Sequence, residues 1–116
     1  MKGVDLMTQT EKLTMLKTLL GMDEFDDSAD TLLEVYLDAS KREILAWRYS
    51  FALEPPDEVP SEYEMVQVYA VIAGYGISGA ENQTEHSENG IRRIFKYEDM
   101  IAYIRAHVLQ IVKVMG

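Results

Sequence analysis

The 116-residue sequence has no cysteine, only three prolines and no long uninterrupted apolar segment. Without cysteine, the chain lacks disulfides, thiolate zinc sites and cysteine nucleophiles, which agrees with a reducing compartment. No segment approaches the roughly 20 consecutive apolar residues that cross a bilayer. The first residues also lack the apolar region of a signal peptide. We therefore expect one domain over residues 1–116, made in a cytoplasm and without a membrane partner.

Basic residues are scarce over most of the chain, and the net charge is −9. Residues 1–90 carry 6 basic and 18 acidic side chains, whereas residues 91–116 carry 5 basic and 2 acidic ones. Because an acidic surface repels phosphates, sequence-specific DNA binding is not expected. The basic last segment has two interpretations. It is a helix end favoured by the helix dipole, or it meets the acidic body of a second copy in a head-to-tail contact that can close into a ring.

Residue patterns of catalysis and metal binding are scarce as well. The chain has two histidines. Glu85, His86 and Glu88 could attract a metal ion, but neighbouring residues with a single histidine make a weak site. His107 is expected at the surface or at the core boundary. The sequence has no phosphate-binding loop, nucleophile elbow, zinc-protease motif or dinucleotide fingerprint. We predict that the protein is not an enzyme and uses no cofactor.

Helical spacing of apolar residues predicts two helices in the first half of the chain. The first begins near Thr8, where Thr8 and Glu11 have the spacing of a capping box, and it ends at Gly21. The second covers residues 28–50, and Trp47 is expected in the core or at its edge.

The segment 22–30 before this second helix carries five acidic residues in nine and invites comparison with a calcium loop. Its acids do not follow the EF-hand positions, because the central glycine and the glutamate at the twelfth position are missing. A structural interpretation is favoured. Acids ahead of a helix satisfy its free N–H groups, with Asp27 or Ser28 as the N-cap.

Two further helices are predicted in the second half. Ser61 and Glu64 have the spacing of another capping box. They open a helix that continues to about Tyr75 and is apolar on all sides, as expected of the central helix. The fourth helix is predicted from Lys96 to about Val114. The fold class is therefore all-α, a small bundle of four main helices with a long polar loop between the third and the fourth.

The polar segment 79–95, GAENQTEHSENGIRRIF, stands between these last two helices. Too few of its residues gain by leaving water for it to form part of a core, so we expect a flexible loop. The segment 108–116 is apolar and has two interpretations. It packs on its own core, or it is a tail that docks in a groove of a partner.

Three segments appear along the chain in a characteristic order. They are T-x-x-E-K-L-x-x-L-K-x-L-L-G from Thr8 to Gly21, followed by leucines at 32, 33 and 37; an apolar helix ending in Tyr75 and Gly76 and leading to Gly79; and EHSENGIRRIF at 85–95. This order resembles the head–tail connector (adaptor) proteins of long-tailed bacteriophages. It covers almost the whole chain. The apolar C-terminal segment after Arg105 departs from the family pattern.

The resemblance implies a structural virion protein, located at the head–tail junction and made in the host cytoplasm. Such proteins form a homo-oligomeric ring of about a dozen copies beneath the portal, bind the stopper or tail-completion protein, and extend the DNA channel. An acidic body suits a channel wall that DNA passes without specific binding. The alternative is an acidic DNA mimic that blocks a nucleic-acid enzyme, which would need paired rows of acids at phosphate-like spacing.

We expect subunit or portal contacts from two groups of residues. They are Ser87, Glu88, Asn89, Gly90, Ile91, Arg92, Arg93, Ile94 and Phe95 in the polar segment, and Ile104, Val108, Ile111 and Val112 on one face of the fourth helix.

Overall fold

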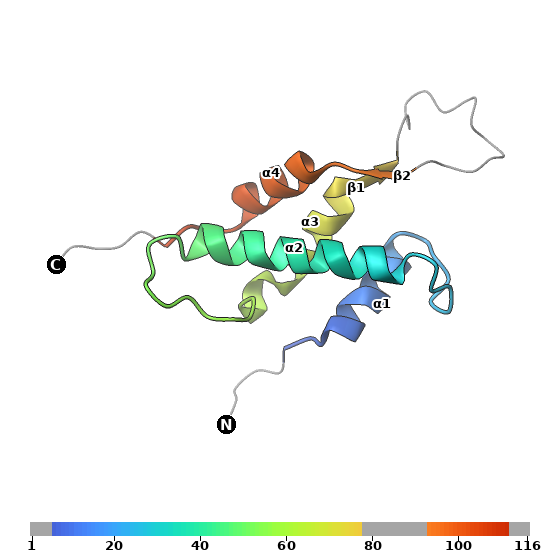
Figure 1. The fold of residues 1–116 in the computed structure, drawn as a ribbon, viewed down its shortest axis with the longest axis horizontal. Coiled ribbons are helices and arrows are strands. Elements are labelled where there is room, and N and C mark those ends of the chain that lie inside the picture. The colour runs from blue at the N-terminus through green and yellow to red at the C-terminus, as the bar shows by residue number, and fades with distance from the viewer. Residues whose placement is uncertain (1–5, 78–92, 112–116) are drawn as a thin grey trace.

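The computed structural model describes residues 6–77 and 93–111. In chain order its elements are α1 (Gln9–Leu19), α2 (Asp30–Arg48), a 3₁₀ turn (Ser61–Tyr63), α3 (Glu64–Gly74), β1 (Tyr75–Ile77), β2 (Arg93–Phe95) and α4 (Tyr97–His107). Helix α3 crosses α2 obliquely, α4 packs against both of them, and α1 lies beside one end of α2 (Figure 1). The predicted four-helix all-α fold is confirmed. The structure adds one short antiparallel pair, β1–β2, which the sequence did not predict.

Helix α1 begins and ends where its sequence predicts. The Glu11 amide donates to Thr8 Oγ1 at 3.0 Å, and the Thr8 amide donates to Glu11 Oε1 at 2.8 Å, so the capping box is confirmed. Gly21 has a φ of 76°, the left-handed conformation predicted for the residue that closes this helix. Local sequence signals therefore determine both ends of α1.

The predicted N-cap of α2 is wrong. The helix begins at Asp30 behind Ala29, which makes no side-chain cap. Two earlier acids hold the preceding turn instead, because Asp23 Oδ1 accepts from the Phe25 amide at 2.9 Å and Asp26 Oδ1 accepts from the Ser28 amide at 3.0 Å. Aspartate commonly bonds the amide two residues ahead, and here that turn replaces the helix cap.

The predicted capping box of α3 is also wrong, although its central position is confirmed. Ser61 opens a 3₁₀ turn, and α3 has no side-chain cap. The Glu64 carboxylate instead accepts from the Met7 amide at 2.7 Å and lies 3.9 Å from Lys12 Nζ. Helix α3 contacts α1, α2 and α4. The Glu64 side chain, which the capping box would use, therefore forms long-range contacts with α1 and with Met7, which precedes it.

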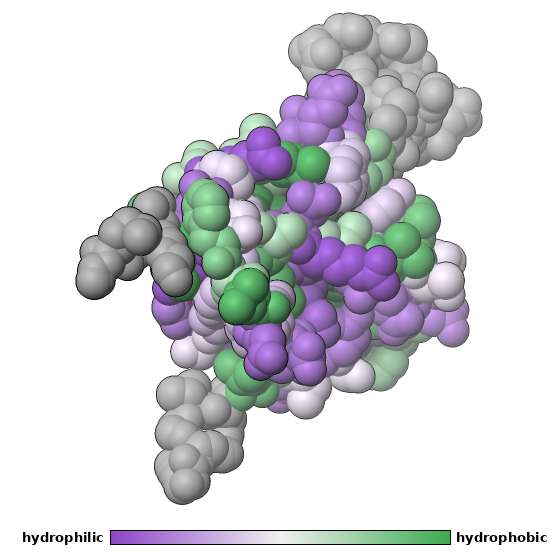
Figure 2. Space-filling view, turned by 60° about the vertical axis from the view of Figure 1, so that its left-hand side comes forward, coloured by the Kyte–Doolittle hydropathy of each residue, from purple (hydrophilic) through white to green (hydrophobic). Residues whose placement is uncertain are grey.

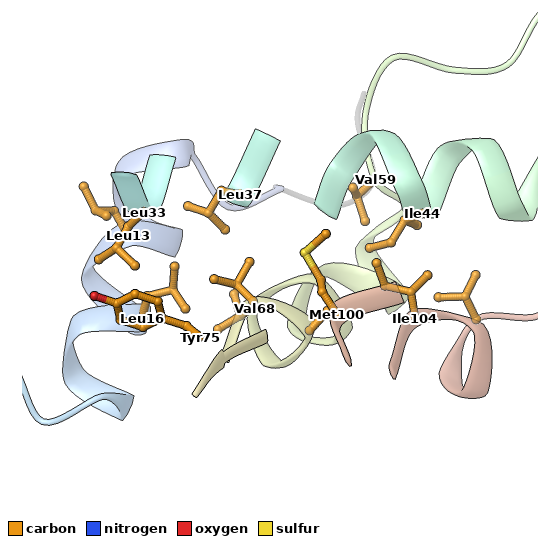
Figure 3. Packing of buried hydrophobic residues seen from close by; sticks show 13 residues of the cluster. Leu13, Leu16, Leu33, Leu37, Ile44, Val59, Val68, Tyr75, Met100 and Ile104 are labelled. Atoms are coloured by element: carbon orange, nitrogen blue, oxygen red, sulfur yellow. The ribbon is translucent and has the colours of Figure 1, made fainter. Parts of the chain in front are cut away.

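The core lies between α2 and α3 and is closed by α1 at one end and by α4 at the other. Figure 3 shows Leu13, Leu16 and Leu33 gathered in one part and Ile44 and Ile104 in another. The fully buried apolar residues are Leu16, Leu33, Leu37, Ile44, Val59, Val68, Ala70, Val71, Met100 and Ile104. Burial of each large side chain contributes about 1.5–3 kcal/mol.

A buried polar chain crosses this core from α1 to α2. Lys12 Nζ donates to Gln67 Oε1 at 2.6 Å, and Gln67 Nε2 donates to the Leu37 carbonyl at 2.9 Å. Burial lowers the pKa of Lys12, and the nearby Glu64 carboxylate opposes that shift. Because these buried groups satisfy one another, they connect three helices without leaving a polar atom of Gln67 unpaired.

Helix α4 is shorter than predicted. It ends at His107, and Val108 is extended, with φ −116° and ψ 126°. The prediction of a helix to about Val114 is wrong, because residues 108–111 bond to side chains and backbone at the end of α2. Tertiary contacts outweigh the apolar helical pattern in this segment.

Candidate assembly surface

The structure separates the predicted contact residues into three groups. Residues 87–92 and Val112 lie outside the described residues. Arg93, Ile94 and Phe95 form β2, and Ile104 belongs to α4. Val108 and Ile111 stand in the extended segment after α4. A continuous helical face from residue 104 to residue 112 therefore does not exist.

Strands β1 and β2 form the base of the predicted polar loop. Their register pairs Tyr75 with Phe95, Gly76 with Ile94 and Ile77 with Arg93. One further bond, from the Lys96 amide to the Gly74 carbonyl at 2.7 Å, continues the pairing. The pair extends from the end of α3 and leads directly into α4 (Figure 1). Both ends of the loop are therefore fixed to the helical body.

Phe95 holds this base against α2. The Phe95 ring stacks on the Tyr36 ring, with ring centroids 3.7 Å apart and planes 10° apart. The Tyr75 ring also contacts Tyr36, with ring centroids 5.9 Å apart. A Cβ atom on Gly74 would lie 2.6 Å from the Phe95 ring, so only glycine allows this approach. Phe95 is half-buried and packs against the edge of the hydrophobic core.

Tyr97 adds a polar contact next to this stack. Its hydroxyl donates to the carboxylate of Glu43 on α2. The carboxylate raises the pKa of Tyr97 to about 12, and partial burial adds to the shift. The start of α4 is thus bound to the middle of α2 by a hydrogen bond beside the aromatic stack.

Two of the predicted contact residues, one on α4 and one directly after it, face inward. Ile104 is 1% exposed and Val108 is 3% exposed, and both belong to the core. In this structure they offer no surface to a second chain. Ile111 differs because it is 44% exposed. Of the four predicted apolar contacts, Ile111 is therefore the described one that lies at the surface.

The extended segment 108–111 lies against the end of α2. The indole of Trp47 donates to the Val108 carbonyl at 2.9 Å, and the Ile111 amide donates to the Arg48 carbonyl at 2.9 Å. Gln110 adds a bond to Ser50 Oγ at 2.6 Å. Trp47 is partly buried against the core, as predicted. These bonds replace the helical bonds that residues 108–111 would otherwise make.

Arg48 is central to this arrangement, and sequence reasoning missed it. Its guanidinium donates to the Leu109 carbonyl at 2.9 Å and lies 4.9 Å from the ring centre of Tyr63. Such cation–π stacking adds to the hydrogen bond. An arginine in the last turn of a helix is usual for the dipole. Nothing in the local sequence indicates a partner 61 residues away.

Exposed apolar side chains surround a hollow at this end of α2. The hollow has a volume of about 370 Å³ and is lined by Tyr49, Phe51, Ala52, Leu53 and Ile111. Leu53 is 98% exposed and Phe51 is 56% exposed. In the view that brings this end forward, hydrophobic surface appears among polar areas (Figure 2). Exposed apolar surface of this kind is typical of a site that binds another protein.

A model of the Phage gp6-like head-tail connector proteins matches residues 10–107. The match extends over every helix of the described fold. The chain belongs to this family. Neither the curated proteins nor the solved structures that were compared gave a significant match. The protein is therefore a structural connector of the phage virion, a class that takes part in head–tail assembly and is not known for catalysis.

The part of the chain that the structure describes offers few side chains that could form a metal or catalytic site. Within 6–77 and 93–111, no three acidic or histidine side chains come together as metal ligands. The weak site predicted at Glu85, His86 and Glu88 lies outside these residues. His107 is exposed, as predicted, and its ring stacks on Tyr103 with centroids 3.9 Å apart. No helix in the described part is long and apolar enough to cross a membrane.

Proposed function

We propose that this connector forms a homo-oligomeric ring that joins the portal to the stopper or tail-completion protein and extends the DNA channel. The ring has about a dozen copies, as the family resemblance implies. The family match over residues 10–107 carries the proposal, because it spans the four helices and both sides of the loop. The protein would act through complementary surfaces and without turnover.

The base of the loop supports a contact role for residues 87–95. Aromatic stacking on Tyr36 and close approach to Gly74 fix the strand that leads out of the loop. A fixed base reduces the freedom that the loop loses when it binds a neighbour. We propose that residues 87–94 reach an adjacent subunit or the portal, while Phe95 anchors them to their own chain.

The charge distribution agrees with a channel protein. Acids gather in the turn 22–30, where Asp23, Glu24, Asp26 and Asp27 are exposed. They stand in a turn and do not form the paired rows that a DNA mimic needs. An acidic channel wall would let DNA pass without binding it. The DNA-mimic alternative gains no support from the positions of these acids.

Native mass spectrometry across a concentration series, with and without the portal ring, tests the proposal. We expect closed oligomers, or portal complexes that carry several copies of the connector. The variant Arg92→Glu/Arg93→Glu should weaken them, because it reverses two charges in the proposed contact segment. Arg42→Glu is the matched control, since Arg42 lies on the exposed side of α2 and pairs with Asp38 on its own helix.

A strict monomer at every concentration, with no binding to the portal, would contradict the ring. Unchanged assembly of the Arg92→Glu/Arg93→Glu variant would remove these two arginines from the interface. Electron microscopy of the purified connector with its portal then gives the copy number directly.

A further inference from the structure

The hollow at the C-terminal end of α2 leaves large apolar side chains in contact with water. Leu53 is 98% exposed, Phe51 is 56% exposed, and Ile111, which lines the same hollow, is 44% exposed. Removing apolar surface from water is favourable roughly in proportion to its area. A segment that covers these three side chains would therefore stabilise the connector.

The described part of the chain ends at the wall of this hollow. Ile111 is the last described residue, and it lies beside the end of α2 (Figure 1). The Ile111 amide donates to the Arg48 carbonyl at 2.9 Å, and Gln110 bonds to Ser50 Oγ at 2.6 Å. These bonds fix the point from which the chain continues. Residues 112–116 follow directly and lie outside the described residues.

Residues 112–116 have the length and the composition to cover the hollow. Five extended residues span at most about 18 Å, which is less than the length of about 28 Å of the 19-residue helix α2. The segment therefore reaches the near end of α2 but not the far end. Val112, Val114 and Met115 are apolar, as the lining of the hollow is. A short tether also gives the segment an effective concentration on the order of millimolar at its own hollow, which favours it over a second copy.

Charge favours the same occupant. The segment 49–63 carries four exposed acids and no base: Glu54, Asp57, Glu58 and Glu62. Residues 112–116 carry Lys113 and no acidic side chain. Glu58 and Glu62 already lie 3.9 and 4.0 Å from basic side chains of α2, so Glu54, exposed directly after Leu53, is the acid that we expect beside Lys113. Attraction between exposed charges is modest and is screened by salt, so apolar contact supplies the main part of the binding.

We propose that residues 112–116 dock in the hollow of their own chain, with their apolar side chains against Phe51, Leu53 and Ile111 and with Lys113 beside the acidic segment. This contact goes beyond the proposed ring and does not depend on it, because it lies within one copy. It assigns the apolar end of α2 to the chain itself and leaves residues 87–94 as the proposed contact with a neighbour.

Methyl NMR of the full chain tests the contact without altering it. In connector labelled at leucine, valine and methionine methyl groups, we expect nuclear Overhauser effects between the methyl groups of Leu53 and those of Val114 or Met115. Leu32 is the matched control, because it is an exposed leucine near the far end of α2, beyond the reach of residues 112–116. Its methyl groups should give no such effect.

A mixed sample separates contact within one copy from contact between copies. One batch is labelled only at leucine and the other only at valine and methionine, and the two are unfolded and refolded together. We expect the effects between Leu53 and residues 112–116 to be lost, because the two labels then stand on different copies. Effects that persist in this sample would overturn the proposal and assign the hollow to a second copy.

A pair of variants tests the chemistry of the contact. Val114→Asp/Met115→Asp should abolish the effects to Leu53, because it replaces two apolar side chains by acids beside an acidic segment. Binding of an apolar fluorescent dye should rise several-fold in this variant. Val114→Leu/Met115→Leu is the matched control and should keep both the contact and the wild-type level of dye binding, because it remains apolar. Equal behaviour of the two variants would contradict the proposal.

The absence of any effect between Leu53 and residues 112–116 in the wild-type connector would overturn the docking outright. A contact that forms only after the portal is added would overturn it as well, because the hollow would then bind the portal or depend on it. The native mass spectrometry described above tests the ring separately, so failure of this contact and failure of the ring are distinguishable.

Discussion

The two ends of α2 are held to the rest of the molecule by different chemistry. At the N-terminal end, the turn 22–30 is held by aspartate–amide bonds and by the buried ammonium of Lys17. At the C-terminal end, the segment 108–111 is held by an indole and a guanidinium that bond to backbone carbonyls. The first end uses contacts close in sequence, whereas the second depends on contacts between distant segments. The sequence indicated the acidic turn at the first end, although the N-cap predicted there was wrong, and it indicated none of the contacts at the second end.

The largest expected effect comes from the core between the two ends. Leu37 is fully buried, and Leu37→Ala should lower the free energy of unfolding by about 2–5 kcal/mol, because it removes apolar contacts and leaves a cavity. Urea unfolding gives this value. Trp47 fluorescence follows one end, and hydrogen exchange of the turn 22–30 follows the other. Separate transitions at the two ends would show that they are independent units.

A smaller loss is expected from the C-terminal end. Arg48→Ala removes the donor to the Leu109 carbonyl and the stack on Tyr63, which should cost about 1–3 kcal/mol. Hydrogen exchange should rise at 108–111 and stay unchanged at 22–30. Arg42→Ala is the control, because the exposed side chain of Arg42 forms its ion pair with Asp38 on the same helix. Equal effects of the two substitutions would remove Arg48 from its proposed role.

The matching change at the N-terminal end is Gly21→Ala. A residue with a Cβ in the left-handed conformation costs about 1–2 kcal/mol, and open space around this position leaves backbone strain as the cause. Thermal unfolding should show the loss, and exchange should rise at 22–30 but not at 108–111. Gly21→Asn should restore part of the stability, because asparagine tolerates this conformation. No difference between the two variants would argue against a backbone cause.

The smallest effect is expected from Tyr97, whose contact with Glu43 lies away from both ends. Folding raises the pKa of Tyr97 from 10.0 to about 12, so the neutral form is favoured in the folded state. Its stabilising contribution is complete below pH 10 and is lost as the pH rises toward 12. Because Tyr97 is partly exposed, the change is small.

Tyr97→Phe should make the melting temperature less dependent on pH between 10 and 12. Spectrophotometric titration of tyrosine in wild type and variant measures the corresponding pKa. An unshifted titration in wild type would contradict the hydrogen bond to Glu43.

The predicted contact residues were only partly placed correctly by the sequence. The pattern at 87–95 and the family resemblance predicted contacts in the loop, and in the structure Phe95 at its base stacks on Tyr36. The apolar spacing of Ile104 and Val108 predicted an outer helical face, yet both residues are buried. Spacing shows which residues share a helical side, but it does not show whether that side faces the chain's own core or a partner.

The hollow at the C-terminal end of α2 was not predicted from the sequence. It combines residues 49–53 with residue 111. Contacts between segments this far apart depend on how α2 and α4 pack. No local sequence pattern predicts that packing.

The sequence by itself determined the helical class, the capping box and glycine end of α1, the central place of α3 and the acidic character of the turn 22–30. These follow from apolar spacing, backbone conformation and charge, which act within a few residues. The tertiary structure alone decided that α4 ends at His107, that Glu64 meets Lys12, and that Arg48 holds the segment 108–111. In each case a residue distant in the sequence forms the contact in place of a local partner. Buried polar groups are paired by whichever partners the fold brings close to them.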